Sequence, residues 1–118
     1  LFPYTTLFRS DMFLMPSLYE PCGLSQMFAM RYGNLPVATS TGGLADSILD
    51  YGADPKKATG FLYDEKNETG LEQSLRIALR VYEDKNEWPI MCRNAMNAHF
   101  SWQISASKYL DIYRKLLA

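Results

Sequence analysis

The order of its periodic segments predicts an α/β protein with a parallel sheet. Three short apolar runs, at 12–15, 35–39 and 60–63, have the length of strands and are bounded by Pro, Gly or polar residues. Segments with helical spacing separate these runs and fill most of the chain after residue 68. Strands that alternate with helices form parallel sheets joined by crossover helices. We therefore predict such a sheet, followed by a helical C-terminal end.

The first strand and the helix after it form the first unit. Met12–Met15 is apolar throughout and stops at Pro16, so we expect a strand that is buried on both faces. A polar loop over 17–23 leads to a helix over 25–32. Four residues share one face of this helix: Leu24, Met27, Phe28 and Arg31. Gly33 follows, and a glycine that tolerates a left-handed backbone is typical of a helix end.

The second unit repeats this order. The apolar run Leu35–Thr39 predicts a strand, and Thr41-Gly42-Gly43 predicts a tight turn after it. A helix is expected from Leu44 to Leu49, then a polar segment over 50–59, then a brief third strand over Gly60–Tyr63.

Three helices are predicted in the C-terminal half. The spacing Thr69-x-x-Glu72 is that of a capping box, Asp84 begins the next helix, and Ser101 caps the last. Each helix carries one apolar stripe that we interpret as core. The stripes are Leu71, Leu75, Ala78, Leu79 and Tyr82; Trp88, Met91, Cys92, Ala95, Met96 and His99; and Trp102, Ala106, Tyr109, Leu110, Tyr113 and Leu117.

Composition argues against several functional classes. The 118 residues carry a net charge of -1, with Lys and Arg scattered among the acids, so we expect no nucleic-acid partner. No apolar run approaches the roughly 18 residues of a membrane helix, so we expect no membrane association. The single His and the two cysteines, Cys22 and Cys92, are far apart in the sequence. They predict neither a metal site nor a disulfide framework.

The start of the sequence and the small number of predicted strands lead to two expectations about its organisation. Residues 1–10, LFPYTTLFRS, match the translation of a widely used sequencing adapter, so we expect them to be non-native and the protein of interest to occupy 11–118. Three strands are also few for a sheet that is buried on both faces. We therefore expect further strands before Asp11.

Two loops are expected at the ligand-binding edge of the sheet, beyond the carboxyl ends of the strands. The loop over 16–24 contains Glu20, whose carboxylate is able to accept hydrogen bonds from sugar hydroxyls. The loop over 40–43 has two adjacent glycines before a helix, an arrangement suited to phosphate. Taken singly, the first is also consistent with an exposed loop acid, and the second with a plain β–α turn.

Together, the loops and their spacing resemble a known family. Asp11-Met-Phe-Leu-Met-Pro-Ser17, Glu20-Pro-Cys-Gly-Leu24, Arg31-Tyr-Gly33 and Thr41-Gly-Gly-Leu-Ala-Asp46 closely resemble bacterial glycogen synthases and plant starch synthases. Gly60-Phe61 and Phe100-Ser101-Trp102 also match that family's pattern. The resemblance implies a GT-B glycosyltransferase, with residues 11–118 as the C-terminal portion of its Rossmann-like nucleotide-sugar-binding domain.

The resemblance also implies roles for particular residues. Glu20 resembles the catalytic-site carboxylate that holds the hydroxyls of the donor glucose. The resemblance assigns the neighbouring turn to substrate binding through Cys22, Gly23 and Leu24. It assigns phosphate binding to Thr41, Gly42 and Gly43. Phe28 stands where many related transferases place a second Glu for the nucleotide ribose, and glycogen synthases usually carry an aromatic residue there. The resemblance assigns Phe28 to substrate binding.

The implied reaction transfers glucose, with retention of configuration, from ADP-glucose to an α-1,4-glucan, without a metal or cofactor. The family's pyrophosphate-binding Arg and Lys and its N-terminal acceptor domain would precede this chain, so we expect the chain alone to be inactive. A cytoplasmic location is implied, or a plastid for a plant protein. Two alternatives remain open: another GT-B hexosyltransferase, and a nonenzymatic α/β binding module.

Overall fold

A three-stranded parallel sheet lies at the centre of the computed structural model, which describes residues 9–117. The strands are β1 (Met12–Met15), β2 (Leu35–Thr39) and β3 (Phe61–Tyr63), and they pair in that order. Met12 pairs with Leu35, and Val37 with Phe61. The predicted α/β class and its parallel sheet are confirmed.

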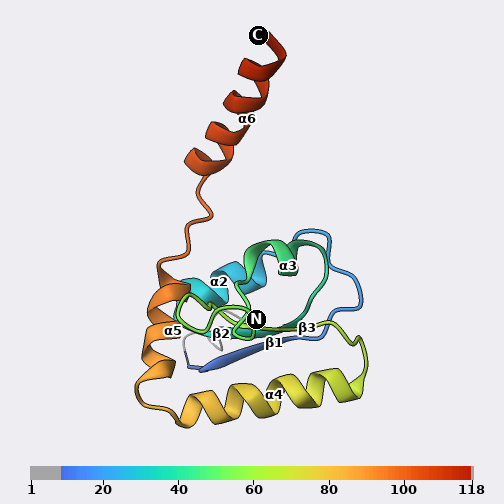
Figure 1. Cartoon of the computed structure of the whole chain (residues 1–118), viewed down its shortest axis with the longest axis vertical. Coiled ribbons are helices and arrows are strands. Elements are labelled where there is room, and N and C mark those ends of the chain that lie inside the picture. Colours follow the sequence, from blue (N-terminus) through green and yellow to red (C-terminus); the bar gives the residue numbers. More distant parts are fainter. Residues whose placement is uncertain (1–8, 118) are drawn as a thin grey trace.

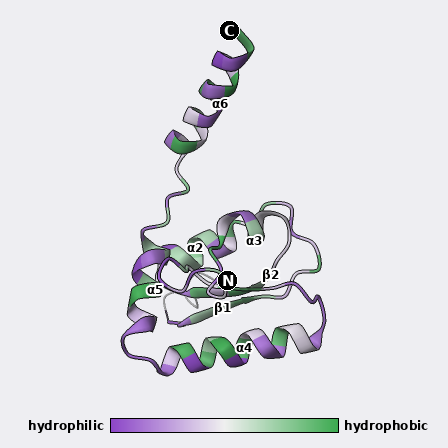
Figure 2. Ribbon diagram, viewed as in Figure 1, coloured by the Kyte–Doolittle hydropathy of each residue, from purple (hydrophilic) through white to green (hydrophobic). Residues whose placement is uncertain are grey.

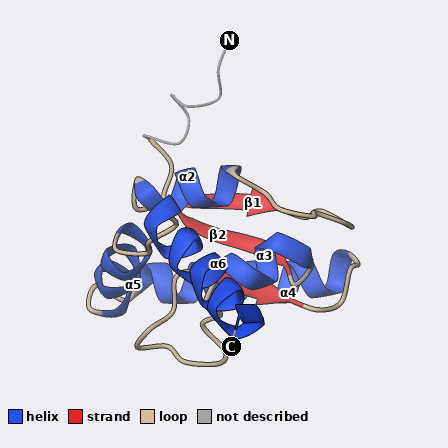
Figure 3. Ribbon diagram, turned by 90° about the horizontal axis from the view of Figure 1, so that it is seen from above, coloured by secondary structure: helices blue, strands red, loops and turns tan. Residues whose placement is uncertain are grey.

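Helices cover both faces of the sheet (Figure 1). The two crossover helices, α2 (Ser25–Arg31) and α3 (Gly42–Ser47), lie on one face, and α4 (Glu68–Glu83) lies on the other. Crossovers of one hand that step in the same direction along a sheet put their helices on the same face. Helix α5 (Glu87–Met96) packs at one end of these layers, and Figure 3 shows the strands running side by side beneath α2 and α3.

The core lies between β2 and the helices on either side. All five residues of β2 are buried, as are Met30 of α2, Leu44 of α3 and Met91 of α5. Figure 2 shows these apolar segments at the centre of the molecule and polar residues on the outer sides of α4 and α5. A central strand is covered on both faces by helices, which explains its unbroken apolar sequence.

The edge strand β1 is less buried than its sequence predicts. Leu14 is 46% exposed, although Met12 and Met15 pack against the core. Among the described residues β1 pairs only with β2, and α4 packs mainly over β2 and β3, so Leu14 has no helix above it. The predicted burial of β1 on both faces is therefore wrong.

Two helices bury a different face from the predicted one. Helix α2 buries Gln26, Ala29 and Met30, whereas Leu24 and Phe28 are exposed. Helix α4 buries a row of mostly small residues, Gly70, Ser74, Ala78 and Val81. A Cβ on Gly70 would overlap the carbonyl oxygen of Glu65, so this glycine allows the start of α4 to lie close to the loop before it. The larger apolar side chains of α4 flank its buried row.

Helix starts also differ in detail from the predicted ones. Asn67, rather than Thr69, caps α4, because its Oδ1 accepts a hydrogen bond from Gly70 N at 2.9 Å. The predicted turn Thr41-Gly42-Gly43 is tighter than expected: α3 already begins at Gly42, after Thr41. Of the α5 stripe, Trp88, Met91 and Ala95 are buried, whereas Met96 and His99 are exposed.

The last helix, α6 (Trp102–Leu117), projects away from the layers (Figure 1). None of its described residues is buried, and Trp102, Tyr109 and Tyr113 are each more than half exposed. The apolar stripe of α6, which was predicted to be part of the core, is therefore not packed into the core of the described structure. The predicted boundary at Asp11 stays a prediction, because most of residues 1–10 lie outside the described range.

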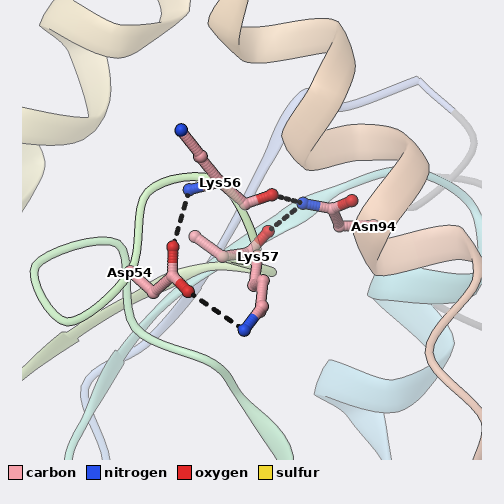
Figure 4. Close-up of polar contacts among 5 residues, drawn as sticks. Asp54, Lys56, Lys57 and Asn94 are labelled. Carbon is pink, nitrogen blue, oxygen red and sulfur yellow. Dashed lines mark hydrogen bonds and ion pairs between the residues drawn. The ribbon is translucent and has the colours of Figure 1, made fainter.

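The polar segment after α3, residues 50–59, is held against α5 by two side chains. Tyr51 donates from its hydroxyl to Glu87 Oε2 at 2.8 Å, and Asn94 bonds two carbonyls of the segment. Asn94 Nδ2 donates hydrogen bonds to the carbonyls of Lys56, at 2.9 Å, and Ala58, at 3.2 Å (Figure 4). Within the segment, Asp54 Oδ1 accepts from Lys56 N at 3.1 Å, and Lys57 forms an ion pair with Asp54 at 3.5 Å. Asn94 thus ties the second half of this segment to α5, as Tyr51 ties the first half through Glu87.

We expect Asn94→Ala to destabilise the fold by about 1–2 kcal/mol, because it removes two hydrogen bonds to carbonyls that α5 partly covers. Urea denaturation followed by circular dichroism measures the change. Asn97→Ala is the matched control, since Asn97 is the exposed C-cap of the same helix and should change stability by less than about 0.5 kcal/mol. Equal effects of the two variants would contradict the anchoring role.

The start of α5 predicts a pH-dependent contribution to stability. Backbone N–H groups of Glu87, at 3.1 Å, and Asn86, at 2.8 Å, donate to Asp84 Oδ1 and lower the pKa of its carboxyl. A folded-state pKa below the unfolded value stabilises the fold above the unfolded pKa, and that stability is lost as pH falls through the folded value. Asp84→Ala should therefore lower the urea midpoint at pH 7 and leave it unchanged at about pH 2. Asp84→Asn, which keeps an acceptor without the charge, should show a smaller loss at pH 7; a loss that persists at low pH for Asp84→Ala would contradict this origin.

Candidate functional site

The three strands end at one edge of the sheet, at Met15, Thr39 and Tyr63. In a parallel sheet the carboxyl ends of neighbouring strands meet, and the loops that follow them form the ligand-binding crevice of open α/β folds. The loop before α2, which we call the Glu20 loop (16–24), and the start of α3, which we call the glycine loop (40–43), both leave from this edge.

The two loops touch through their backbones. Gly43 N donates a hydrogen bond to the carbonyl oxygen of Glu20 at 3.0 Å. A Cβ on Gly42 would overlap that same oxygen, and a Cβ on Gly43 would overlap the carbonyl oxygen of Cys22. Both glycines are therefore needed for this close approach, and Gly42 also has a φ of +44°, which favours glycine.

This contact gives the N–H group of Gly43 a partner within the protein, whereas the prediction assigned Gly43 to phosphate. Its N–H is bonded to the Glu20 loop, so in this structure Gly43 joins the two loops through its donor. Gly42 is exposed beside it, and Thr41 Oγ1 accepts from Lys66 Nζ at 3.2 Å. The phosphate-binding role predicted for Thr41, Gly42 and Gly43 stays a prediction.

The turn at the end of the Glu20 loop has a fixed shape. Gly23 has a φ of +67°, a left-handed conformation that other residues rarely adopt. Glu20 is partly buried, whereas Cys22 is exposed and carries a free thiol. The carboxylate and the turn thus lie within three residues of each other, at the strand edge and against the glycine loop.

The remaining predicted residues lie on another surface. Leu24, 63% exposed, and Phe28, 42% exposed, line a groove of about 460 Å³ together with Arg31 and the segment 98–101 between α5 and α6. The structure therefore separates Phe28 from the glycine loop. The substrate contacts predicted for Phe28 and for the backbone of Leu24 stay predictions.

Lys66 is a candidate that sequence reasoning missed. It lies in the loop after β3, and its Nζ donates to the carbonyl of Leu18 at 3.0 Å and to Thr41 Oγ1 at 3.2 Å. This cation bridges the Glu20 loop and the glycine loop from the third strand. Its position in the loop that follows β3 is the feature of the sequence that could have identified it.

One sizeable hollow does not coincide with this edge. About 550 Å³ opens between β3 and α4, lined by residues such as Tyr51, Asp64 and Arg80, and it includes none of the predicted site residues. A smaller hollow of about 180 Å³ lies at the strand edge and includes Thr39, Tyr63 and Lys66. We place the candidate site at the strand edge, because the close backbone contacts and the cation converge there.

Residues 9–117, the part of the chain that the structure describes, carry neither a cluster of metal ligands nor a membrane-spanning helix. Within that range no group of three His, Cys, Asp or Glu side chains is placed to hold a metal ion. Over the same described residues, none of the helices has the length and apolar character needed to span a membrane.

Comparison with known proteins decides the family. Residues 3–90 match the family described as "Glycosyl transferases group 1". The chain belongs to this family. This glycosyl transferase chain is 50% identical over 109 residues to the glycogen synthase of Elusimicrobium minutum, a match that covers 92% of the chain and 23% of the relative. The glycogen synthase of Thermotoga petrophila is 46% identical over 110 residues, with the same coverage.

Solved structures agree with the fold of this glycosyl transferase. The catalytic domain of starch synthase IV from Arabidopsis thaliana, bound to ADP and acarbose, superposes with a TM-score of 0.80 and 41% identity, covering 90% of the chain and 22% of that domain. Sucrose-phosphate synthase from Thermosynechococcus elongatus gives a TM-score of 0.62 at 26% identity, covering 91% and 25%. The chain thus spans about a quarter or less of these relatives, and the expected GT-B-type fold is confirmed for that part.

Proposed function

We propose that this chain is part of a retaining glucosyltransferase that moves glucose from ADP-glucose to the non-reducing end of an α-1,4-glucan. The main support for the proposal is the backbone contact between the Glu20 loop and the glycine loop at the strand edge. It occurs in a chain that is 50% identical over 109 residues to a glycogen synthase. The starch synthase neighbour is described with ADP and acarbose, which supports an adenine nucleotide donor and a glucan-like acceptor.

The residue roles follow from this placement. The partly buried Glu20 would accept hydrogen bonds from the donor glucose, and the turn Cys22-Gly23-Leu24 would donate its backbone N–H groups beside that sugar. Thr41, Gly42 and Gly43 would face the diphosphate, with Lys66 as a nearby positive charge. Such groups hold the donor and stabilise the leaving diphosphate, which is the protein's main contribution to this transfer.

Two alternative functions are weaker. A sucrose-type hexosyltransferase shares the fold, but the solved example is 26% identical, against 41% for the starch synthase. Phe28 and the Glu20-Pro-Cys-Gly-Leu24 stretch also favour a glucan synthase. A nonenzymatic α/β module does not account for the membership in a transferase family. We propose a cytoplasmic location for the enzyme, or a plastid for a plant protein.

A chimera tests the proposal. Residues 11–118 would replace the matched segment of the Elusimicrobium minutum glycogen synthase, which supplies the remainder of the enzyme. We expect the chimera to transfer labelled glucose from ADP-glucose to glycogen, and the 118-residue chain alone to show no transfer. A folded chimera that transfers glucose to fructose 6-phosphate but not to glycogen would overturn the proposed acceptor. A folded chimera with no transfer would overturn the proposed function.

A further inference from the structure

Two polar side chains behind the candidate site remain unexplained by the roles given so far. Gln26 of α2 is fully buried, with 0% of its surface exposed, and Ser47 lies at the end of α3. A buried amide is costly unless its polar atoms are hydrogen-bonded. What these two side chains bond to therefore indicates why they are there.

Ser47 fixes the direction of the hydrogen bonds. Its Oγ lies 2.6 Å from the carbonyl oxygen of Gly43, so its single proton is donated to the glycine loop. The same Oγ lies 3.1 Å from Gln26 Nε2. Because a hydroxyl has one proton to give, Ser47 accepts from Gln26.

Gln26 carries the connection to the Glu20 loop. Its Nε2 donates to the carbonyl of Gly23 at 2.9 Å and lies 3.3 Å from that of Cys22, in addition to its bond with Ser47. Three acceptors on one side fix the orientation of the amide. Its Oε1 is buried against Gly23 and, among the described residues, has no hydrogen-bond partner. An unpaired buried acceptor costs about 1–3 kcal/mol, so this amide is not explained by stability alone.

The two side chains complete a closed connection between the loops. On one side Gly43 N donates to the carbonyl of Glu20, and on the other the carbonyl of Gly43 is bonded through Ser47 and Gln26 to the carbonyls of Cys22 and Gly23. Both polar groups of the Gly43 backbone are thus tied to the Glu20 loop. The two loops are held as one rigid unit.

We propose that Gln26 and Ser47 are positioning residues, which set the distance between the sugar-binding Glu20 loop and the phosphate-binding glycine loop. The inference rests on the proposed function, since it assigns one part of a nucleotide sugar to each loop. Gln26 is fully buried and both side chains bond to loop backbone, so their action on the donor is indirect. Their effect is to hold the sugar end in register with the diphosphate end, where a displacement of about 1 Å is able to cost about 100-fold in rate.

Hydrogen exchange in the full chain tests the connection without any activity. In Ser47→Ala we expect faster exchange in both segments, 16–24 and 40–47, whereas Ser47→Thr should keep the protection because it keeps the hydroxyl. Ser74→Ala is the matched control, since Ser74 is a buried serine on α4 whose Oγ has no partner among the described residues. Faster exchange confined to 40–47 in Ser47→Ala would overturn the proposal.

Kinetics in the chimera test the consequence for the donor. Gln26→Met should lower kcat/KM for ADP-glucose by about 100-fold and Ser47→Ala by about tenfold, with wild-type-like values for Ser47→Thr. The affinity for ADP alone should change by less than about threefold, because ADP occupies only one loop. Equal losses for ADP and ADP-glucose would overturn the positioning role. Coupled exchange of the two loops in a chimera without activity would instead refute the proposed function and leave the loop connection standing.

Discussion

Glu20→Gln in the chimera should lower kcat/KM for ADP-glucose by about 100- to 1,000-fold. The substitution keeps the size of the side chain and removes its charge, so the hydrogen bonds that we propose from two sugar hydroxyls would lose their charge-assisted strength. At about 2 kcal/mol for each such bond, the loss corresponds to that range of kcat/KM. Initial rates of glucose incorporation at several ADP-glucose concentrations measure it.

The control for this variant is Glu83→Gln, which removes the same charge at the exposed C-terminal end of α4. It should keep wild-type activity. Binding of ADP, measured by calorimetry, should also survive in Glu20→Gln, because the role proposed for the carboxylate is to bind the sugar. If Glu20→Gln retains more than about a third of the wild-type kcat/KM, the carboxylate does not hold the donor.

The architecture follows from short-range patterns in the sequence, but the buried faces of the helices do not. The strand β2 has the predicted bounds because a mostly apolar run bordered by Asn34 and Ser40 has few alternatives. The buried face of α4 was mispredicted because small residues, such as Ser74 and Ala78, occupy it while larger ones flank them. Apolar size is a poor guide where a helix approaches a sheet closely.

The two loops of the candidate site could be predicted from the sequence, whereas the side chains that hold the loops together could not. The carboxyl ends of parallel strands bring the Glu20 loop and the glycine loop together, a consequence of topology that the strand order already contains. Gln26 is different, because an isolated Gln in a helix is ordinarily interpreted as solvent-exposed. Its burial depends on carbonyl groups that come together only in three dimensions. Lys66 lies in a loop after a strand, which is a signal in the sequence, but its contacts with Leu18 and Thr41 form only in the folded chain.

Gly43→Ala should have the second large effect, on stability and activity together. The added Cβ would overlap the carbonyl oxygen of Cys22, which is backbone and is held from behind by Gln26. The loops must separate to admit it, at a cost of about 1–3 kcal/mol. The separation also breaks the bond from Gly43 N to the Glu20 carbonyl, so we expect about a 100-fold loss of kcat/KM in the chimera.

Gly52→Ala separates this effect from a general intolerance of alanine. A Cβ on Gly52 would meet the carboxylate of Asp50, which accepts from Gly52 N and Leu62 N, and would touch neither of the two loops. Stability is therefore expected to fall while activity stays near wild type. The affinity of Gly43→Ala for ADP and for ADP-glucose then decides between two causes. A larger loss for ADP-glucose means that the sugar has lost its register with the diphosphate, as a rigid pair of loops requires. If stability falls while kcat/KM stays within about threefold of wild type, the donor does not depend on the contact between the loops.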